Sequence, residues 1–141
     1  MDPYSKGLIP NDIYSSKITV RGKIVSIMNA HLNNRDLKLI KEPTRAFRKH
    51  DLVEIIATDE VKYPGENINS IAYIGFTEIL NGGVIRRDDT LLINEKALGK
   101  VLGFDATHAP NHYNLIVHVT ELVTGKGLEL SLGDLTKFVY K

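Results

Sequence analysis

Residues 103–114 hold the densest group of chemically capable side chains in the chain: one carboxylate, two imidazoles and two amides. Loops between strands often carry binding and catalytic groups, because a rigid scaffold can position them there. We therefore take this loop as the candidate site. Its polar side chains include Asp105, His108, Asn111, His112 and Asn114.

The proline of this loop sets its expected geometry. Residues 109–112 fit a type I turn with Pro110 at the second position, and proline excludes a helix that continues through the loop. Such a turn places His108 and His112 on either side of it, while Asp105 lies where the preceding strand ends. The three side chains are therefore expected to converge.

This set of side chains suits two kinds of chemistry. Two imidazoles and one carboxylate can hold a divalent metal, such as Zn, Mn or Fe(II), and leave positions open for water or substrate. Without a metal, Asp105 could orient a histidine that acts as general acid or base near neutral pH. Both arrangements predict an enzyme of the hydrolase, lyase or isomerase type that acts on a polar small molecule. Asp105, His108 and His112 would be its catalytic residues and, in the first case, its metal ligands. The structural alternative is that these side chains only stabilise their own loop.

Two amides and a further histidine are candidates for ligand binding. Asn111 and Asn114 could hold polar groups of a ligand or orient the imidazoles. If residues 112–120 are extended, His118 shares one face of the strand with His112 and Asn114.

Two residues outside the loop complete the candidate ligand site. Residues 74–78 read Ile-Gly-Phe-Thr-Glu and resemble the Leu-Gly-Phe-Asp-Ala of residues 102–106. This echo gives Glu78 the place in one half of a barrel that Asp105 has in the other. Tyr63, beside the Pro-Gly turn, could line a cavity at the barrel mouth.

The most basic stretch of the chain supports a competing function. It contains Lys41, Arg45, Phe47, Arg48 and Lys49, which could bind single-stranded nucleic acid or another anionic ligand in an OB-like or SH3-like binding module. A formal net charge of +1 and an aromatic content of 7% make nucleic acid the less favoured ligand. The sequence has no phosphate-binding glycine loop and no dinucleotide motif, so no nucleotide cofactor is expected.

Hydrophobic alternation predicts the elements that must position these groups. Apolar residues repeat with period two in short segments separated by turn residues, a pattern typical of strands in an all-β domain. The predicted strands cover residues 17–28, 37–40, 51–57, 70–80, 84–93, 98–104, 112–120, 128–132 and 135–140. Hairpin turns are predicted at residues 81–83 and 124–127, and one helical turn at residues 94–98.

We expect these segments to form a single small β-barrel, or a barrel-like sandwich, of about eight mostly antiparallel strands. The barrel domain would span residues 17–141. Residues 1–16 are rich in proline, glycine and turn formers and predict an irregular arm that lies on the barrel or on a neighbouring subunit of a homo-oligomer.

Bulk composition favours an ordinary folded domain. The 141 residues are 43% hydrophobic and 25% charged, close to the averages for globular proteins. The absence of cysteine excludes disulfides and thiolate metal sites. No apolar run approaches the length of a membrane span, and no secretory signal is recognisable, so a cytoplasmic location is expected.

Overall fold

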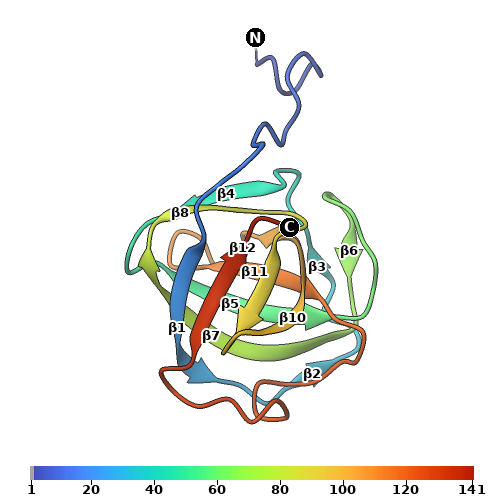
Figure 1. Cartoon of the computed structure of the whole chain (residues 1–141). Helices are drawn as coiled ribbons and strands as arrows, with labels where there is room; N and C mark the ends of the chain where they lie inside the picture. The colour runs from blue at the N-terminus through green and yellow to red at the C-terminus, as the bar shows by residue number, and fades with distance from the viewer. Residues whose placement is uncertain (1) are drawn as a thin grey trace.

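An eight-stranded sheet closes on itself in the computed structural model, which describes residues 2–141 (Figure 1). Its strand order is β1-β12-β9-β10-β11-β5-β7-β2, and an additional pairing between β1 and β7 closes the ring and leaves β2 outside it. The described residues contain no helix, and so none that could cross a membrane. The prediction of a small all-β barrel is confirmed. The strands of this sheet are β1 Val20–Ile27, β2 His31–Leu32, β5 Leu52–Thr58, β7 Ile71–Asn81, β9 Thr90–Ile93, β10 Lys96–Asp105, β11 Tyr113–His118 and β12 Leu135–Val139.

Two strand pairs lie outside the ring. β4 (Thr44–Phe47) pairs with β8 (Gly83–Arg86) and lies across one end of the barrel, near the base of the N-terminal arm (Figure 1). β3 (Leu37–Lys38) pairs with β6 (Asn67–Ile68) against the outer wall. These two strand pairs cover apolar side chains at the end of the barrel and on its outer wall.

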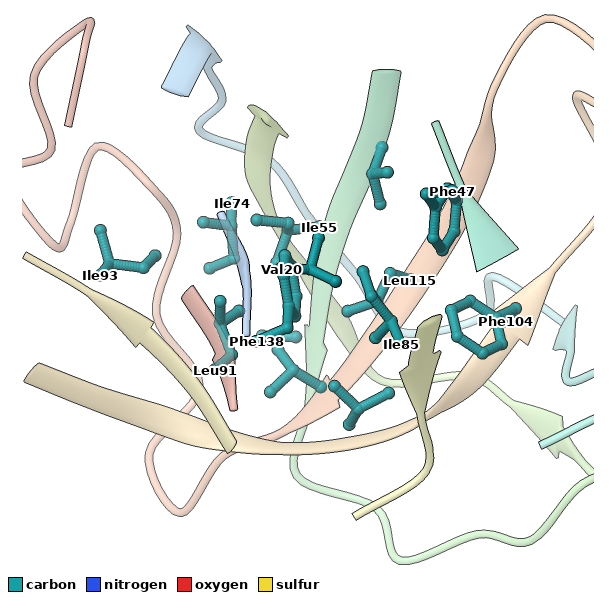
Figure 2. Close-up of a cluster of buried hydrophobic side chains, with 14 of the residues drawn as sticks. Val20, Phe47, Ile55, Ile74, Ile85, Leu91, Ile93, Phe104, Leu115 and Phe138 are labelled. Atoms are coloured by element: carbon teal, nitrogen blue, oxygen red, sulfur yellow. The ribbon is translucent and has the colours of Figure 1, made fainter. Parts of the chain in front are cut away.

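Two hydrophobic clusters follow from this arrangement. The larger fills the barrel interior, and Figure 2 shows Phe47 and Phe104 at one side of it and Ile93 at the other. The smaller cluster lies on the outer face of the wall, where Leu37 and Ile68 of the β3–β6 pair pack with Ile56 of β5 and other apolar side chains of the wall. β5 is consequently buried on both faces for most of its length.

Four local predictions were wrong. Residues 81–83 do not form a hairpin, because β7 ends at Asn81 and the chain crosses to the barrel end, where β8 pairs with β4. Residues 94–98 form no helical turn: Asn94 and Glu95, both with positive φ, make a tight turn between β9 and β10, and residues 96–98 are the start of β10. Residues 124–127 close no hairpin and residues 128–132 form no strand; this segment is a loop, and a Cβ at Gly125 would collide with the Ile74 carbonyl.

Two turns repeat the same geometry. In one, the Arg48 amide donates to Asp51 Oδ2 and the Asp51 amide donates to the Arg48 carbonyl. In the other, Arg86 and Asp89 make the same two bonds. The first turn connects β4 to β5 and the second connects β8 to β9, so each joins a strand of the pair at the barrel end to a strand of the barrel wall.

A buried ion pair connects the chain just before β1 to the barrel. Lys17 Nζ lies 2.8 Å from Asp89 Oδ2 and also donates to the Phe138 carbonyl, and both charged side chains are almost fully buried. Burial raises the pKa of Asp89 and lowers the pKa of Lys17, against the stabilising effect of each on the other. Arg86 reaches the arm itself through Asp12 Oδ2 at 2.6 Å.

Residues 2–16 form no strand, and they leave the barrel beyond this contact (Figure 1). The arm exposes Leu8 and Ile13. The predicted division into arm and barrel stays a prediction, as does the homo-oligomer; residue 1 lies outside the described residues.

We expect Lys17→Met to lower the free energy of unfolding by about 3 kcal/mol, because it leaves the Asp89 carboxylate buried without its main partner. Urea denaturation measures this change. Lys137→Met is the matched control: it removes a more exposed ion pair with Glu95 and should change stability by less than about 1 kcal/mol. Equal effects of the two substitutions would contradict this role of Lys17.

Candidate functional site

The loop after β10 turns at a proline, but not as predicted. The Ala109-Pro110 peptide bond is cis, and the Asn111 amide donates to the His108 carbonyl at 3.0 Å. Pro110 therefore occupies the third position of a turn over residues 108–111, the arrangement of a type VI turn. The type I turn over residues 109–112 was wrong, because that geometry requires a trans bond.

Asp105 is used within the loop. Its Oδ1 accepts hydrogen bonds from the Thr107 amide and from Asn114 Nδ2, and its Oδ2 accepts one from the Thr107 hydroxyl. Its carboxylate makes no hydrogen bond or ion pair with His108 or His112 in the described chain. The expected convergence of the three side chains is therefore seen for the two histidines but not for Asp105, whose contacts are those of a residue that shapes the loop.

The two loop histidines do lie together. Their rings stack with centroids 4.9 Å apart, and His108 is exposed while the side chain of His112 is only 10% exposed. Phe76 of β7 meets the His112 ring edge-on at 4.9 Å. His112 is thus held between an apolar ring and a second imidazole.

A carboxylate from the barrel wall takes the place expected for Asp105. Glu54 Oε1 lies 3.4 Å from His112 Nε2, and the Glu54 side chain is only 8% exposed. Glu54 is on β5, which pairs in parallel with β11 so that Glu54 lies opposite Asn114. Because Val53 and Ile55 point into the interior cluster, Glu54 points outward beneath the loop.

The environment of Glu54 favours its uncharged form. Burial raises the pKa of the Glu54 carboxyl above its usual value, and the neighbouring charges of His112, His108 and Arg35 only partly oppose this effect. A carboxyl group of this kind beside an imidazole is typical of acid–base sites.

Two buried atoms beside Glu54 have no hydrogen-bond partner among residues 2–141. They are His112 Nε2 and Asn114 Oδ1. Buried polar atoms in native proteins are nearly always paired, so unpaired ones call for an explanation, and a functional site is a common one. On its other side, His112 Nδ1 lies 2.9 Å from Asn111 Nδ2. If that amide donates, the proton of the neutral ring is on Nε2 and faces Glu54.

The geometry gives no support to a metal centre. Across residues 2–141, no group of three or more histidine, aspartate or glutamate side chains is arranged to hold a metal ion. For Asp105, His108 and His112 the reason is plain, since the Asp105 oxygens are bonded to Thr107 and Asn114.

The three remaining candidates lie apart from this group. His118 is at the far end of β11, opposite Thr58 of β5 and Lys100 of β10. Glu78 is a half-buried residue of β7, and its carboxylate lies 2.9 Å from Nδ1 of the exposed His50. Tyr63 is 60% exposed and packs under the guanidinium of Arg87.

A cavity of about 460 Å³ joins the loop to the basic stretch. His112 of the loop and both Arg45 and Arg48 of the basic stretch line it. Thus the two regions that the sequence offered as competing sites face one cavity. Its lining residues are Arg45, Ala46, Phe47, Arg48, Asp51, Leu52, Pro110, Asn111, His112 and Tyr113.

Sequence reasoning missed Glu54 and Tyr113 as site residues. The signal for Glu54 was present: it is the one charged residue in the apolar run Leu52-Val-Glu-Ile-Ile-Ala57. A charge within a strand that is otherwise apolar on both faces needs a buried partner. The identity of that partner depended on the parallel pairing with β11.

The chain belongs to a family of unknown function, DUF6917, whose family model matches residues 14–139. Comparisons with curated proteins and with solved structures gave no match.

We expect Glu54→Gln to be more stable than the wild type at neutral pH. A carboxyl whose pKa is raised on folding costs stability as pH rises above its unfolded value of 4.5, and the cost levels off above the raised pKa. The advantage of Glu54→Gln should therefore be absent near pH 4 and grow towards pH 8, measured by thermal unfolding. The exposed Glu121→Gln is the control and should show no such trend. If the wild type instead became more stable relative to Glu54→Gln as the pH rises, the proposed effect of burial on the Glu54 carboxyl would be contradicted.

Asp105→Ala should lower the free energy of unfolding by about 1–3 kcal/mol, because it leaves the buried Asn114 amide without its acceptor. Chemical denaturation measures this loss. Asn111→Ala, which removes one exposed hydrogen bond of the same loop, serves as the comparison and should cost less. A fully stable Asp105→Ala protein would show that the loop does not need this carboxylate.

Proposed function

We propose that the protein is an enzyme that performs acid–base chemistry on a small molecule bound in the cavity beside His112. One observation carries the proposal: a nearly buried Glu54–His112 pair borders a cavity large enough for a small ligand. Hydrolase, lyase and isomerase reactions all use a proton transfer of this kind.

The two residues have different roles in this proposal. His112 lines the cavity and would exchange a proton with the substrate through Nδ1, which a ligand reaches by replacing the exposed amide of Asn111. Glu54 does not line the cavity, so it is a positioning residue that acts through His112. Its carboxylate at Nε2 holds the ring in place and stabilises the imidazolium that forms when His112 accepts a proton.

The surroundings support this division of roles. Phe76 and His108 pack on the His112 ring and fix its plane. The low exposure of both side chains strengthens the attraction between the Glu54 carboxylate and the imidazolium that forms during proton transfer, because little water screens it. A metal-assisted form of the reaction stays a prediction, and the described part of the chain has no donor cluster to support it. A cytoplasmic location likewise stays part of the proposal.

A non-catalytic binding module is the second candidate, and one observation favours it. Arg45 presents a guanidinium to the same cavity with no acidic partner among the described residues. A protein that only recognises an anion would need that arginine but would not need Glu54.

Incubation with a metabolite extract tests for catalysis by offering the protein many small molecules at once. We expect wild-type protein to consume at least one small metabolite, and His112→Asn to do so about 100-fold more slowly or not at all. Mass spectrometry before and after incubation measures this. Glu54→Gln should also change the pH dependence of consumption, whereas Glu54→Asp should partly retain it.

His118→Asn is the matched control, because His118 is a half-buried histidine of the same strand region that lies away from the cavity. It should retain wild-type consumption. An extract left unchanged by the wild type, or changed equally by His112→Asn, would refute the enzymatic proposal.

A further inference from the structure

The cavity beside His112 has two chemically different walls. One is formed by Pro110, Asn111, His112 and Tyr113 at the end of the loop, and the other by the end strand β4 and the turn that follows it. Its volume of about 460 Å³ is within the range of roughly 300–1,000 Å³ that is usual for small-molecule sites.

Arg45 is the most unusual residue of this cavity. Its guanidinium carbon lies 3.5 Å from the centre of the Tyr113 ring and 5.5 Å from that of Phe47. Stacking on a ring leaves the in-plane N–H groups of a guanidinium free to donate to an anion. Arg45 Nε is buried and has no hydrogen-bond partner, and Arg45 forms no ion pair within the described residues.

Charge in the cavity favours an anion. Arg45 and Arg48 face a single carboxylate, that of Asp51. Asp51 already accepts a 2.7 Å hydrogen bond from the Arg48 amide, which holds it in the turn. An arginine left without an acidic partner beside a cavity is the residue that most readily binds a carboxylate or phosphate in two-point contact.

Apart from Asn111 and His112, the remaining lining is apolar or aromatic. This part of the lining includes Phe47, Leu52, Pro110 and Tyr113. Leu52 is 40% exposed, so an apolar side chain is open to the cavity. A ligand that filled the cavity would cover this surface with an apolar or planar group of its own.

We propose that this cavity binds small molecules in which a carboxylate or phosphate group is attached to an aromatic or apolar body, with Arg45 as the anion-binding residue. The inference rests on the proposed function and deepens it by naming the class of substrate. Bound in this way, the anionic group lies on the Arg45 side and the body of the molecule extends towards His112, where the proton transfer takes place.

A nucleic-acid strand fits this surface less well. Lys41 lines a different hollow, together with Lys38 and Thr107, and Lys49 does not line the cavity. The basic residues therefore do not form a continuous track along which a phosphate backbone could run.

Calorimetric titration with simple probes tests the inference. Benzoate and phenyl phosphate separate the carboxylate and phosphate sources of the anion, and benzamide is the neutral counterpart of benzoate. We expect at least one of the two anions to bind with a Kd of about 1 mM or below, a range open to ligands of this size. Benzamide should bind at least about tenfold more weakly.

Arg45→Gln should weaken binding of the anion by about tenfold or more, and Arg45→Lys should lose part of the affinity, since lysine keeps the charge but not the planar fork. The exposed Arg21→Gln on β1 is the matched control and should bind as the wild type does. Thermal unfolding shows whether each variant is folded. If Arg45→Gln does not fold, Arg48→Gln provides a second test of anion binding.

Failure of this inference is distinct from failure of the proposed function. Anion binding that is unaffected by Arg45→Gln and Arg48→Gln, or absent for both anions, overturns the inference even if His112-dependent turnover is found. Tighter binding of an oligothymidylate than of phenyl phosphate also overturns it. Arginine-dependent anion binding without any turnover supports the site and refutes the enzyme.

Discussion

The parallel pairing of β5 with β11 is the interaction on which the site depends. It places Glu54 opposite Asn114 and next to the loop that ends at His112. Parallel neighbours cannot be joined by a hairpin, so a long connection separates these strands in sequence. The barrel closes around that pair, and the loop before β11 covers the outer face of β5. A carboxylate is thereby buried in a wall where alternation would have exposed it.

This burial has opposite effects on stability and on chemistry. Desolvation disfavours the ionised Glu54, which raises its pKa, and it leaves His112 Nε2 without a hydrogen bond. Both features cost folding free energy, and both are typical of groups arranged for proton transfer instead of for stability. The Lys17–Asp89 pair is more deeply buried, but its lysine also donates to a backbone carbonyl, and the pair connects the chain before β1 to the barrel.

Much of this fold could be predicted from local patterns. Alternation located β1, β5, β7 and β12 to within a few residues, because each of these strands has at least one face in the barrel interior. The loop at residues 103–114 was recognised from its residue types, and two of its three proposed catalytic side chains do lie together. The hairpin at residues 81–83 was wrong because turn residues show that the chain bends but not where the next strand pairs. The carboxylate beside His112 was wrongly predicted for a similar reason. Asp105 was expected there and Glu54 is found there, because the choice between the two depends on pairing between strands far apart in sequence.

The cavity unites two regions that are separate in the sequence. Arg45 reaches it because β4 lies across the barrel end, and Tyr113 supplies the ring that holds the guanidinium. The guanidinium of Arg45 is held at the cavity only because Tyr113 of the other region packs against it. The pair β4–β8 therefore contributes to the site as directly as the loop does, and we infer that Arg45 and His112 act on one bound molecule.

An NMR titration of histidine- and tyrosine-labelled protein with phenyl phosphate tests that claim most directly. We expect the ring resonances of His112 and Tyr113 to shift together as the ligand binds, while those of His31, His50 and His118 stay unchanged. Binding that shifts other rings and leaves the His112 ring unchanged would contradict the claim.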